Sequence, residues 1–146
     1  MVIILVHWQI KKGQELAFEE FWKTLMNVEG KNGFFRETLT SPVTMSDPKL
    51  NTWSITDPNY STYINIGCWS SVEDFERAVQ ETMPKASQAT DQTSGRTKQT
   101  IELEPFEFKV RERVVLRTIF ERGGALPDIS ILEPPVAELQ MREMSV

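Results

Sequence analysis

Hydrophobic and polar residues recur along this chain with two different periods. Alternation with a period of two predicts strands over residues 1–10, 34–44, 63–69 and 106–120. Apolar residues at helical spacing predict helices over residues 14–28 and 72–83. The polar tract 85–100 has neither period, and we expect a long surface loop or a frayed continuation of the second helix.

The segment 63–69 carries the clearest strand signal and leads directly into the second helix. Its apolar residues share one face of the strand: Ile64, Ile66 and Cys68. The opposite face carries the remaining residues: Tyr63, Asn65, Gly67 and Trp69. A carboxamide and an indole on one side of a strand predict the wall of a pocket.

Two serines follow this strand and compete for the N-cap of the second helix. Ser70 predicts a capping box with Glu73, in which each side chain bonds a free backbone amide. Ser71 is the alternative N-cap, whose hydroxyl would accept from an amide of the first turn.

The order of elements, β-α-β followed by β-α-β, predicts an α+β fold of the ferredoxin-like type. In this split β-α-β sandwich, right-handed crossovers place both helices on one face of an antiparallel four-stranded sheet. We expect residues 1–122 to form this domain and residues 123–146 to form a C-terminal extension. The apolar run 129–132 would add an edge strand to a partner subunit.

The face of the sheet without helices is predicted to be chemically mixed. We assign His7, Asn65, Trp69 and arginines of the last strand to it, whereas the second strand is ambiguous. A mixed face suits a cavity lined by sheet and made most simply by packing two sheets face to face in a homodimer. The prediction is a dimeric α/β barrel that holds a small molecule.

Composition and net charge disfavour several classes of binding partner and of cellular compartment. A formal net charge of −5 over 146 residues disfavours nucleic-acid binding, because contacts to phosphates need a basic surface. One cysteine, Cys68, cannot form an internal disulfide, and one His with one Cys cannot build a soft-ligand metal site. The apolar run 2–6 is too short for the core of a signal peptide, and no stretch approaches the ~20 apolar residues that cross a bilayer. We expect a cytoplasmic protein without metal, nucleic-acid or membrane partners.

The end of the third strand matches a known pattern. The pattern is Trp-x-Ser-x-Glu-x-Phe, and the residues that match it are Trp69, Ser71, Glu73 and Phe75. With the opening strand and helix, residues 1–120 resemble the antibiotic-biosynthesis monooxygenase family of dimeric α/β barrels. Members that oxidise polycyclic phenols and anthrones to quinones use neither metal nor flavin. The resemblance therefore implies a cofactor-independent monooxygenase for a small aromatic or polyketide-like substrate.

The resemblance also implies roles for individual residues. In those members an Asn lies four residues before the motif Trp, which Asn65 matches, and an Arg of the last strand is matched by Arg111 or Arg113. Their Tyr six residues after the Trp is Phe75 here, which lacks the hydroxyl. Haem-degrading relatives have a haem-ligating His ten residues after the Trp, where this chain has Val79, so haem is not implied.

These positions make chemical sense for proton loss from a phenol or enol. Asn65 and Trp69 would donate hydrogen bonds to the developing oxyanion, each worth ~3 kcal/mol. Arg111 would lower the pKa of the substrate, and His7 would act as the base near neutral pH. The residues predicted to contact the substrate are Arg113, Tyr63 and Phe75.

Each of these residues also has a purely structural interpretation. Trp69 can serve the core, Asn65 can satisfy a backbone group, and the arginines can pair with nearby acids. Phe75 and the lack of a second clear acid–base residue favour the alternative function. That alternative is a non-catalytic homodimeric module of the stress-response type that binds a small ligand.

Overall fold

The structure of the chain is a computed structural model that describes residues 1–43, 51–83, 87–90, 97–100 and 103–124. The strands are β1 (Val2–Lys11), β2 (Phe34–Thr40), β3 (Tyr60–Trp69), β4 (Ser87–Thr90), β5 (Thr97–Thr100) and β6 (Glu107–Arg117). The helices are α1 (Glu15–Thr24) and α2 (Val72–Thr82). The predicted C-terminal extension begins at residue 123, and its residues from 125 onward lie outside the described ranges.

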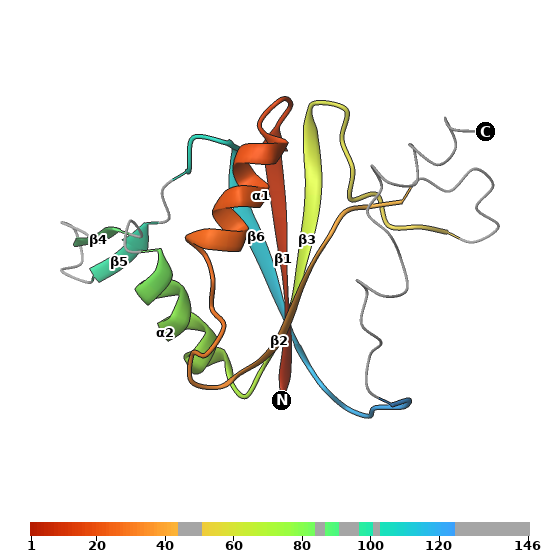
Figure 1. The fold of residues 1–146 in the computed structure, drawn as a ribbon, viewed down its shortest axis with the longest axis vertical. Helices are drawn as coiled ribbons and strands as arrows, with labels where there is room; N and C mark the ends of the chain where they lie inside the picture. Colours follow the sequence, from red (N-terminus) through yellow and green to blue (C-terminus); the bar gives the residue numbers. More distant parts are fainter. Residues whose placement is uncertain (44–50, 84–86, 91–96, 101–102, 125–146) are drawn as a thin grey trace.

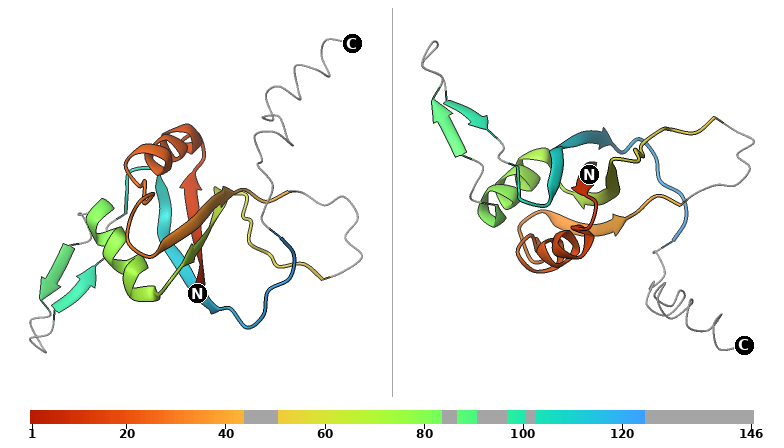
Figure 2. Two further views of the ribbon diagram at one scale, coloured as in Figure 1. Left: turned by 60° about the horizontal axis from the view of Figure 1, so that its bottom comes forward. Right: turned by 90° about the horizontal axis from the view of Figure 1, so that it is seen from above.

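Four of the strands form one antiparallel sheet in the order β2-β3-β1-β6. Helices α1 and α2 both lie on one side of this sheet (Figures 1 and 2). This arrangement is the ferredoxin-like fold, which confirms the fold class predicted from the order of elements. Among the described residues, no helix is long and apolar enough to cross a membrane.

Helix α1 is shorter than the hydrophobic period predicts. It ends at Thr24 because the amides of Leu25 and Met26 both bond the carbonyl of Phe21, which closes the last turn. Leu25 is consequently 68% exposed, whereas Met26 and Val28 are buried although they lie beyond the helix. The chain that follows α1 therefore contributes directly to the core.

The described residues of the tract 85–100, which are 87–90 and 97–100, form strands and not the surface loop or frayed helix that the composition favours. Within it, β4 and β5 pair as an antiparallel two-stranded sheet, with Ser87 opposite Thr100 and Thr90 opposite Thr97. Threonine has a β-branched side chain that suits extended backbone. Strands were not predicted from this propensity, because the tract has no apolar alternation.

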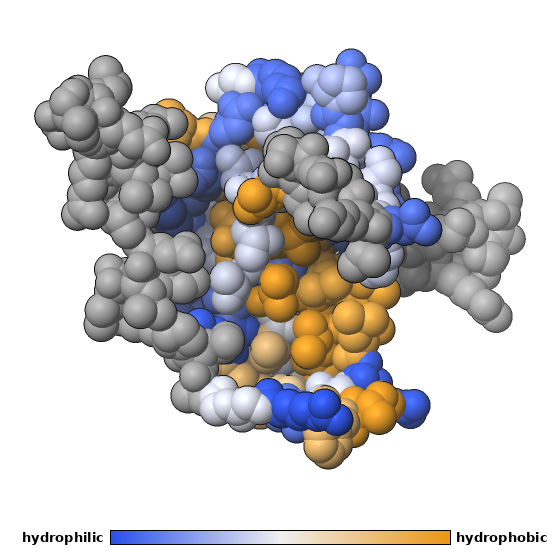
Figure 3. All heavy atoms as spheres, turned by 90° about the vertical axis from the view of Figure 1, so that its right-hand side faces the viewer, coloured by the Kyte–Doolittle hydropathy of each residue, from blue (hydrophilic) through white to orange (hydrophobic). Residues whose placement is uncertain are grey.

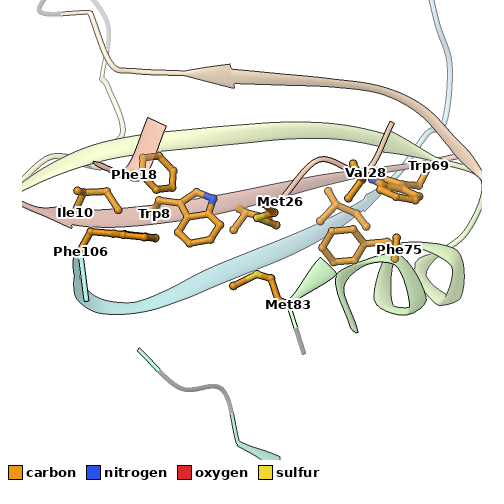
Figure 4. Packing of buried hydrophobic residues seen from close by; sticks show 12 residues of the cluster. Trp8, Ile10, Phe18, Met26, Val28, Trp69, Phe75, Met83 and Phe106 are labelled. Carbon is orange, nitrogen blue, oxygen red and sulfur yellow. The ribbon is translucent and has the colours of Figure 1, made fainter. Parts of the chain in front are cut away.

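The core lies between the sheet and the helices. Alternate residues of β1 form its floor and are at most 4% exposed: Ile4, Val6, Trp8 and Ile10. Figure 4 shows Trp8 grouped with Phe18 and Phe106 at one end of this layer, and Trp69 with Phe75 at the other. Met26 and Val28 fill the space between the two groups.

The start of α2 is held by contacts on both of its sides. Ser71 is the N-cap, since its Oγ accepts a bond of 3.2 Å from the amide of Asp74, so the second of the two predicted caps is correct. Asp74, and not Glu73, occupies the third helical position, and its carboxylate also bonds Ser70 and Arg77. The amide of Ser70 donates to the carbonyl of Gly33, which fixes the α1–β2 connection against this helix end.

The uncovered face of the sheet is apolar along its central strands. Pairing places Ile3 beside Cys68 and Leu116, and Leu5 beside Ile66 and Val114. Figure 3 views the side of the molecule away from the helices and shows hydrophobic residues gathered there. Exposed apolar residues of this face include Ile66, Val114 and Leu116.

We expect Gly33→Ala to destabilise the protein more than Gly30→Ala. Both glycines have φ near +80°, at 82° and 81°, so an alanine at either costs about 1 kcal/mol of backbone strain. A Cβ on Gly33 would also lie 2.4 Å from Ser70 Oγ and on the carboxylate of Asp74, whereas a Cβ on Gly30 would meet nothing within 4 Å. Displacing Asp74 from its bonds should cost Gly33→Ala about 1 kcal/mol more in urea unfolding. Equal losses in the two variants would contradict this packing.

Candidate functional site

The pairing of β3 with β1 turns the side of β3 that carries Asn65 and Trp69 toward the helices. Asn65 lies opposite Val6 and Gly67 lies opposite Ile4, and directly paired residues point to the same face of a sheet. Because Ile4 and Val6 belong to the helix-covered core, Asn65 and Trp69 do as well. The prediction that Asn65, Trp69 and arginines of the last strand lie on the uncovered face is therefore wrong, and the candidate site lies inside the subunit, between sheet and helices.

The indole of Trp69 folds back along its own strand over Gly67. A Cβ on Gly67 would lie 3.0 Å from the indole Nε1 and 3.3 Å from its Cδ1, so this position tolerates the indole because it has no side chain. The rings of Phe34 and Phe75 pack edge-on against the indole, with centroids 5.2 and 5.6 Å away. Trp69 is only 1% exposed, and its Nε1 has no hydrogen-bond partner among the described residues.

Asn65 contributes a second buried polar group to the same place. The residue is 2% exposed, and its Oδ1 has no hydrogen-bond partner within the described part of the chain. A buried polar atom without a partner costs free energy, so such atoms are rare in folded proteins. Asn65 and Trp69 lie two positions before and after Gly67. The unpaired acceptor of Asn65 and the unpaired donor of Trp69 are therefore suited to bind a ligand.

Glu37 of β2 is the third polar side chain beside Asn65 and Trp69, and it was not predicted from the sequence. It lies directly opposite Gly67, so its side chain points to the helix-covered face, with its Cβ about 5 Å from the Cβ position of that glycine. Burial disfavours the charged carboxylate and raises the pKa of Glu37 from 4.5 to about 7, against a smaller opposing effect from a side-chain hydrogen bond with Asn65. A carboxyl with this pKa exchanges its proton near neutral pH.

A bulge in β2 explains why the face of Glu37 was ambiguous in the sequence. Phe34 pairs with Trp69 and Arg36 with Cys68, so Phe35 is an extra residue and is 60% exposed. The sequence did contain a signal for Glu37. This charged residue lies two positions before Leu39, so an alternation through Leu39 assigns its side chain to the core face.

The two predicted arginines also lie on the helix-covered face, but they are engaged differently. Arg111 pairs with the fully buried carboxylate of Glu107, and its guanidinium lies 4.8 Å from the ring centre of Trp8. Arg113 forms a 2.8 Å ion pair with Glu76 of α2 and lies 5.5 Å from the ring centre of Phe75. Arg113 is therefore linked to Trp69 through Phe75, whereas Arg111 anchors β6 at the Trp8 end of the core.

Tyr63 and Phe75 occupy opposite ends of this layer. The hydroxyl of Tyr63 donates to Glu19 of α1 at 3.2 Å, and its ring packs on Phe18. Burial, together with the negative charge of Glu19, raises the pKa of the Tyr63 hydroxyl, so the phenol keeps its proton. Phe75 instead packs on the indole of Trp69, so of these two residues only Phe75 contacts the Asn65–Trp69 region.

The prediction that His7 shares a face with Asn65 and Trp69 is wrong. His7 lies opposite Ile64 and Glu112, which places it on the uncovered face, with its ring 6.4 Å from that of Tyr60. Alternation within a strand defines two sides, but it does not say which side of one strand matches which side of its neighbour. The mixed face expected from the sequence is therefore split, with the amide, indole and arginines inside and the histidine outside.

A groove of about 440 Å³ is lined by Glu37, and by none of Asn65, Gly67 and Trp69. Its walls are the end of α1, the chain that follows it and the start of β2, with Trp22, Met26, Val28, Phe34 and Glu37 among the lining residues. The Nε1 of Trp22 is also buried without a partner among the described residues. A second hollow of about 710 Å³ is lined by Tyr63 but by none of Glu37, Asn65 and Trp69. The described residues include no cluster of three His, Cys, Asp or Glu side chains that could hold a metal ion.

Comparison with known proteins gives a likeness of fold. No family model matches the chain. No curated protein matches it by sequence. The structure superimposes on a mutant of MhuD, solved with two manganese protoporphyrin IX molecules bound per active site, with a TM-score of 0.53 and 15% identity over 85% of this chain and 100% of that one. The two proteins share a fold.

Two further structures are similar at lower scores. One is a candidate antibiotic biosynthesis monooxygenase from Nitrosomonas europaea, with a TM-score of 0.49 and 11% identity over 82% of this chain and all of that one. The other is a mutant of SnoaB, a cofactor-independent oxygenase from Streptomyces nogalater, with a TM-score of 0.43 and 18% identity over 87% and 98% of the two chains. At these identities the comparison concerns the fold alone, and residue roles have to be argued from the site itself.

We expect Glu37→Gln to make the protein more stable than wild type above pH 7 and to have little effect below pH 4.5. The folded-state pKa of Glu37, about 7, exceeds its unfolded value of 4.5, so the unfolded chain releases this proton first and stability falls as pH rises between the two values. With allowance for partial exposure, the difference should be about 1–3 kcal/mol at pH 8. Urea unfolding from pH 4 to 8 measures it, and Glu29→Gln, which removes an exposed carboxylate of the same groove, is the control. A difference that does not change with pH would show that Glu37 ionises normally.

Proposed function

We propose that this protein is a monooxygenase-like enzyme that oxidises a small aromatic or polyketide-like phenol or enol with O₂, without metal or flavin. The reaction site is the space around Gly67 between the sheet and the helices. The single observation that carries the proposal is the unpaired, fully buried Nε1 of Trp69, held over Gly67 beside the unpaired Oδ1 of Asn65.

The chemistry follows from what these groups can bind. The indole N–H donates to the oxygen of a phenolate or enolate, the charge that must develop before the substrate can reduce O₂. The unpaired Oδ1 of Asn65 can accept from the hydroxyl of the neutral substrate before the proton is lost, and the surrounding rings of Phe34 and Phe75 provide an apolar, water-poor wall. Arg113, stacked on Phe75, adds positive charge that favours the anionic form of the substrate.

Oxygen uptake with a panel of anthrones and hydroquinones tests this function. We expect Asn65→Ala and Trp69→Phe each to lower kcat/KM by about 10²-fold, because Trp69→Phe removes the donor to the oxyanion and Asn65→Ala removes the acceptor that orients the substrate hydroxyl. Trp69→Phe keeps an aromatic ring beside Phe34 and Phe75 while it removes the N–H. His7→Gln, on the uncovered face, is the control and should retain the wild-type rate. Equal rates in all four proteins would refute the roles of Asn65 and Trp69.

We further propose that the uncovered face of the sheet binds a second copy of the chain, as in a dimeric α/β barrel. One face of an antiparallel sheet is normally polar when it meets water, but here Ile66, Val114 and Leu116 are 36%, 48% and 43% exposed. A two-fold axis parallel to the strands lays β2 of one copy over β6 of the other.

We expect Val114→Asp to convert a dimer into a monomer, because it buries an unpaired charge in the interface. Sedimentation velocity over a dilution series measures the dissociation constant, which should rise by at least 100-fold. Leu16→Asp is the matched control, since Leu16 is 81% exposed on α1, on the other side of the sheet. A wild-type protein that sediments as a monomer at all concentrations would refute the dimer.

A further inference from the structure

Glu37 is the acidic side chain that the sheet register brings to the unpaired groups of the site. It lies across the strand pair from Gly67, the glycine over which the Trp69 indole folds, and it is hydrogen-bonded with Asn65. The carboxyl, the indole N–H and the carboxamide therefore surround one position on the sheet. Nothing in the fold requires a carboxyl there, and burying one is unfavourable without a function.

Few other charges act on Glu37. The residues of β3 that flank it on this face are uncharged: Asn65, Gly67 and Trp69. The charged side chains that line the groove from α1, the following chain and β2 are all exposed: Lys23, Glu29 and Arg36. On α2, the buried residues Phe75 and Ala78 are apolar. The protonation of Glu37 is thus governed by burial and by whatever molecule occupies the space beside it.

The groove gives that molecule a route to the carboxyl. Glu37 is a lining residue, and so are the apolar Met26, Val28 and Phe34, which suit an aromatic ring system. Met26 and Val28 come from the chain after α1 and lie between the Trp8 group and the Trp69–Phe75 pair (Figure 4). A flat substrate that enters here would contact Glu37 on one side and the core aromatic residues on the other.

We propose that Glu37 is the acid–base residue of this site, which takes the proton from a phenol or enol substrate that enters through the groove lined by Trp22, Met26, Val28 and Phe34. This assignment rests on the proposed oxygenase function and replaces His7 as the base. His7 cannot reach the same substrate, because it points from the opposite face of the sheet.

The reaction balances with O₂ as the oxidant. The substrate O–H bond breaks, its proton goes to the Glu37 carboxylate, and its electron pair stays on the substrate as an enolate. The enolate carbon forms a C–O bond with O₂ after one-electron transfer, and Glu37 returns the proton to the distal oxygen of the resulting peroxide. Loss of the remaining C–H proton with cleavage of the O–O bond gives a carbonyl and water, so a CH₂ group and O₂ become C=O and H₂O.

Two measurements on the full chain test the proposal. In the first, kcat/KM for anthrone oxidation is followed from pH 5 to 9. The wild-type profile should rise to a plateau through an apparent pKa near 7. Glu37→Gln should abolish this rise and lower the rate at pH 7 by at least 100-fold. The rate of Glu37→Gln should recover as the pH approaches the pKa of the free substrate, because the solution then supplies the anion.

The second measurement does not depend on turnover. A hydroxyanthraquinone, which cannot undergo this oxidation, changes its visible absorption when its phenol ionises. Bound to wild-type protein, its phenol should ionise at a higher pH than when it is bound to Glu37→Gln, because a carboxylate beside the phenol disfavours the phenolate. Glu20→Gln, which alters an exposed carboxylate of α1 that does not line the groove, should match the wild type in both measurements.

The outcomes separate the two proposals. If the wild type oxidises anthrones and Glu37→Gln keeps its rate and its pH profile, the role of Glu37 is overturned and the oxygenase function stands. If the wild type consumes no O₂ but the pKa of the bound phenol falls in Glu37→Gln, the oxygenase function fails and the contact between Glu37 and the bound phenol stands. If the hydroxyanthraquinone does not bind, or ionises equally in both proteins while no O₂ is consumed, both proposals are overturned.

Discussion

The register between β1 and β3 is the constraint on which the rest of this site depends. Val6 opposite Asn65 and Ile4 opposite Gly67 commit the polar side of β3 to the interior, where the helices cover it. A shift of one residue would exchange the two faces of β3, placing Ile64, Ile66 and Cys68 inside and the amide and indole outside. The pairing therefore decides both where the core lies and on which side of the sheet any chemistry can occur.

The interior built on this register combines ordinary packing with unusual polarity. Around Trp8, Phe18 and Phe106 the side chains form an aromatic cluster that needs no function to explain it. Around Gly67 an indole N–H and a carboxamide oxygen are buried without partners among the described residues, as is the indole N–H of Trp8, and here burial also raises the pKa of the Glu37 carboxyl to about 7. Such groups lower the stability of a fold, so a carboxyl placed beside two unpaired polar atoms is better explained by a ligand than by packing.

Several features of the fold and of the site could be predicted from the sequence. The strand at 63–69, the Ser71 cap and the two amphipathic helices follow from local periodicity and capping chemistry, which act over a few residues. Asn65 and Trp69 were predicted as a pair because they share a face of one strand. Glu37 was not found, since a bulge at Phe35 breaks the alternation that would have assigned its face, and the Thr-rich hairpin β4–β5 has no apolar pattern to announce it.

By itself, the sequence determined the order of the elements of the main sheet and its helices, the ferredoxin-like class and the two sides of β1, β3 and β6, because these depend on the period of side chains along one segment. Only the tertiary structure decided which sides of different strands face the same way. That choice removed His7 from the site and brought Glu37 into it, since hydrogen-bond register between strands is set by the whole sheet and its bulges. The placement of the Trp69 indole over Gly67 likewise required the folded chain, where the absence of one Cβ leaves room for the ring.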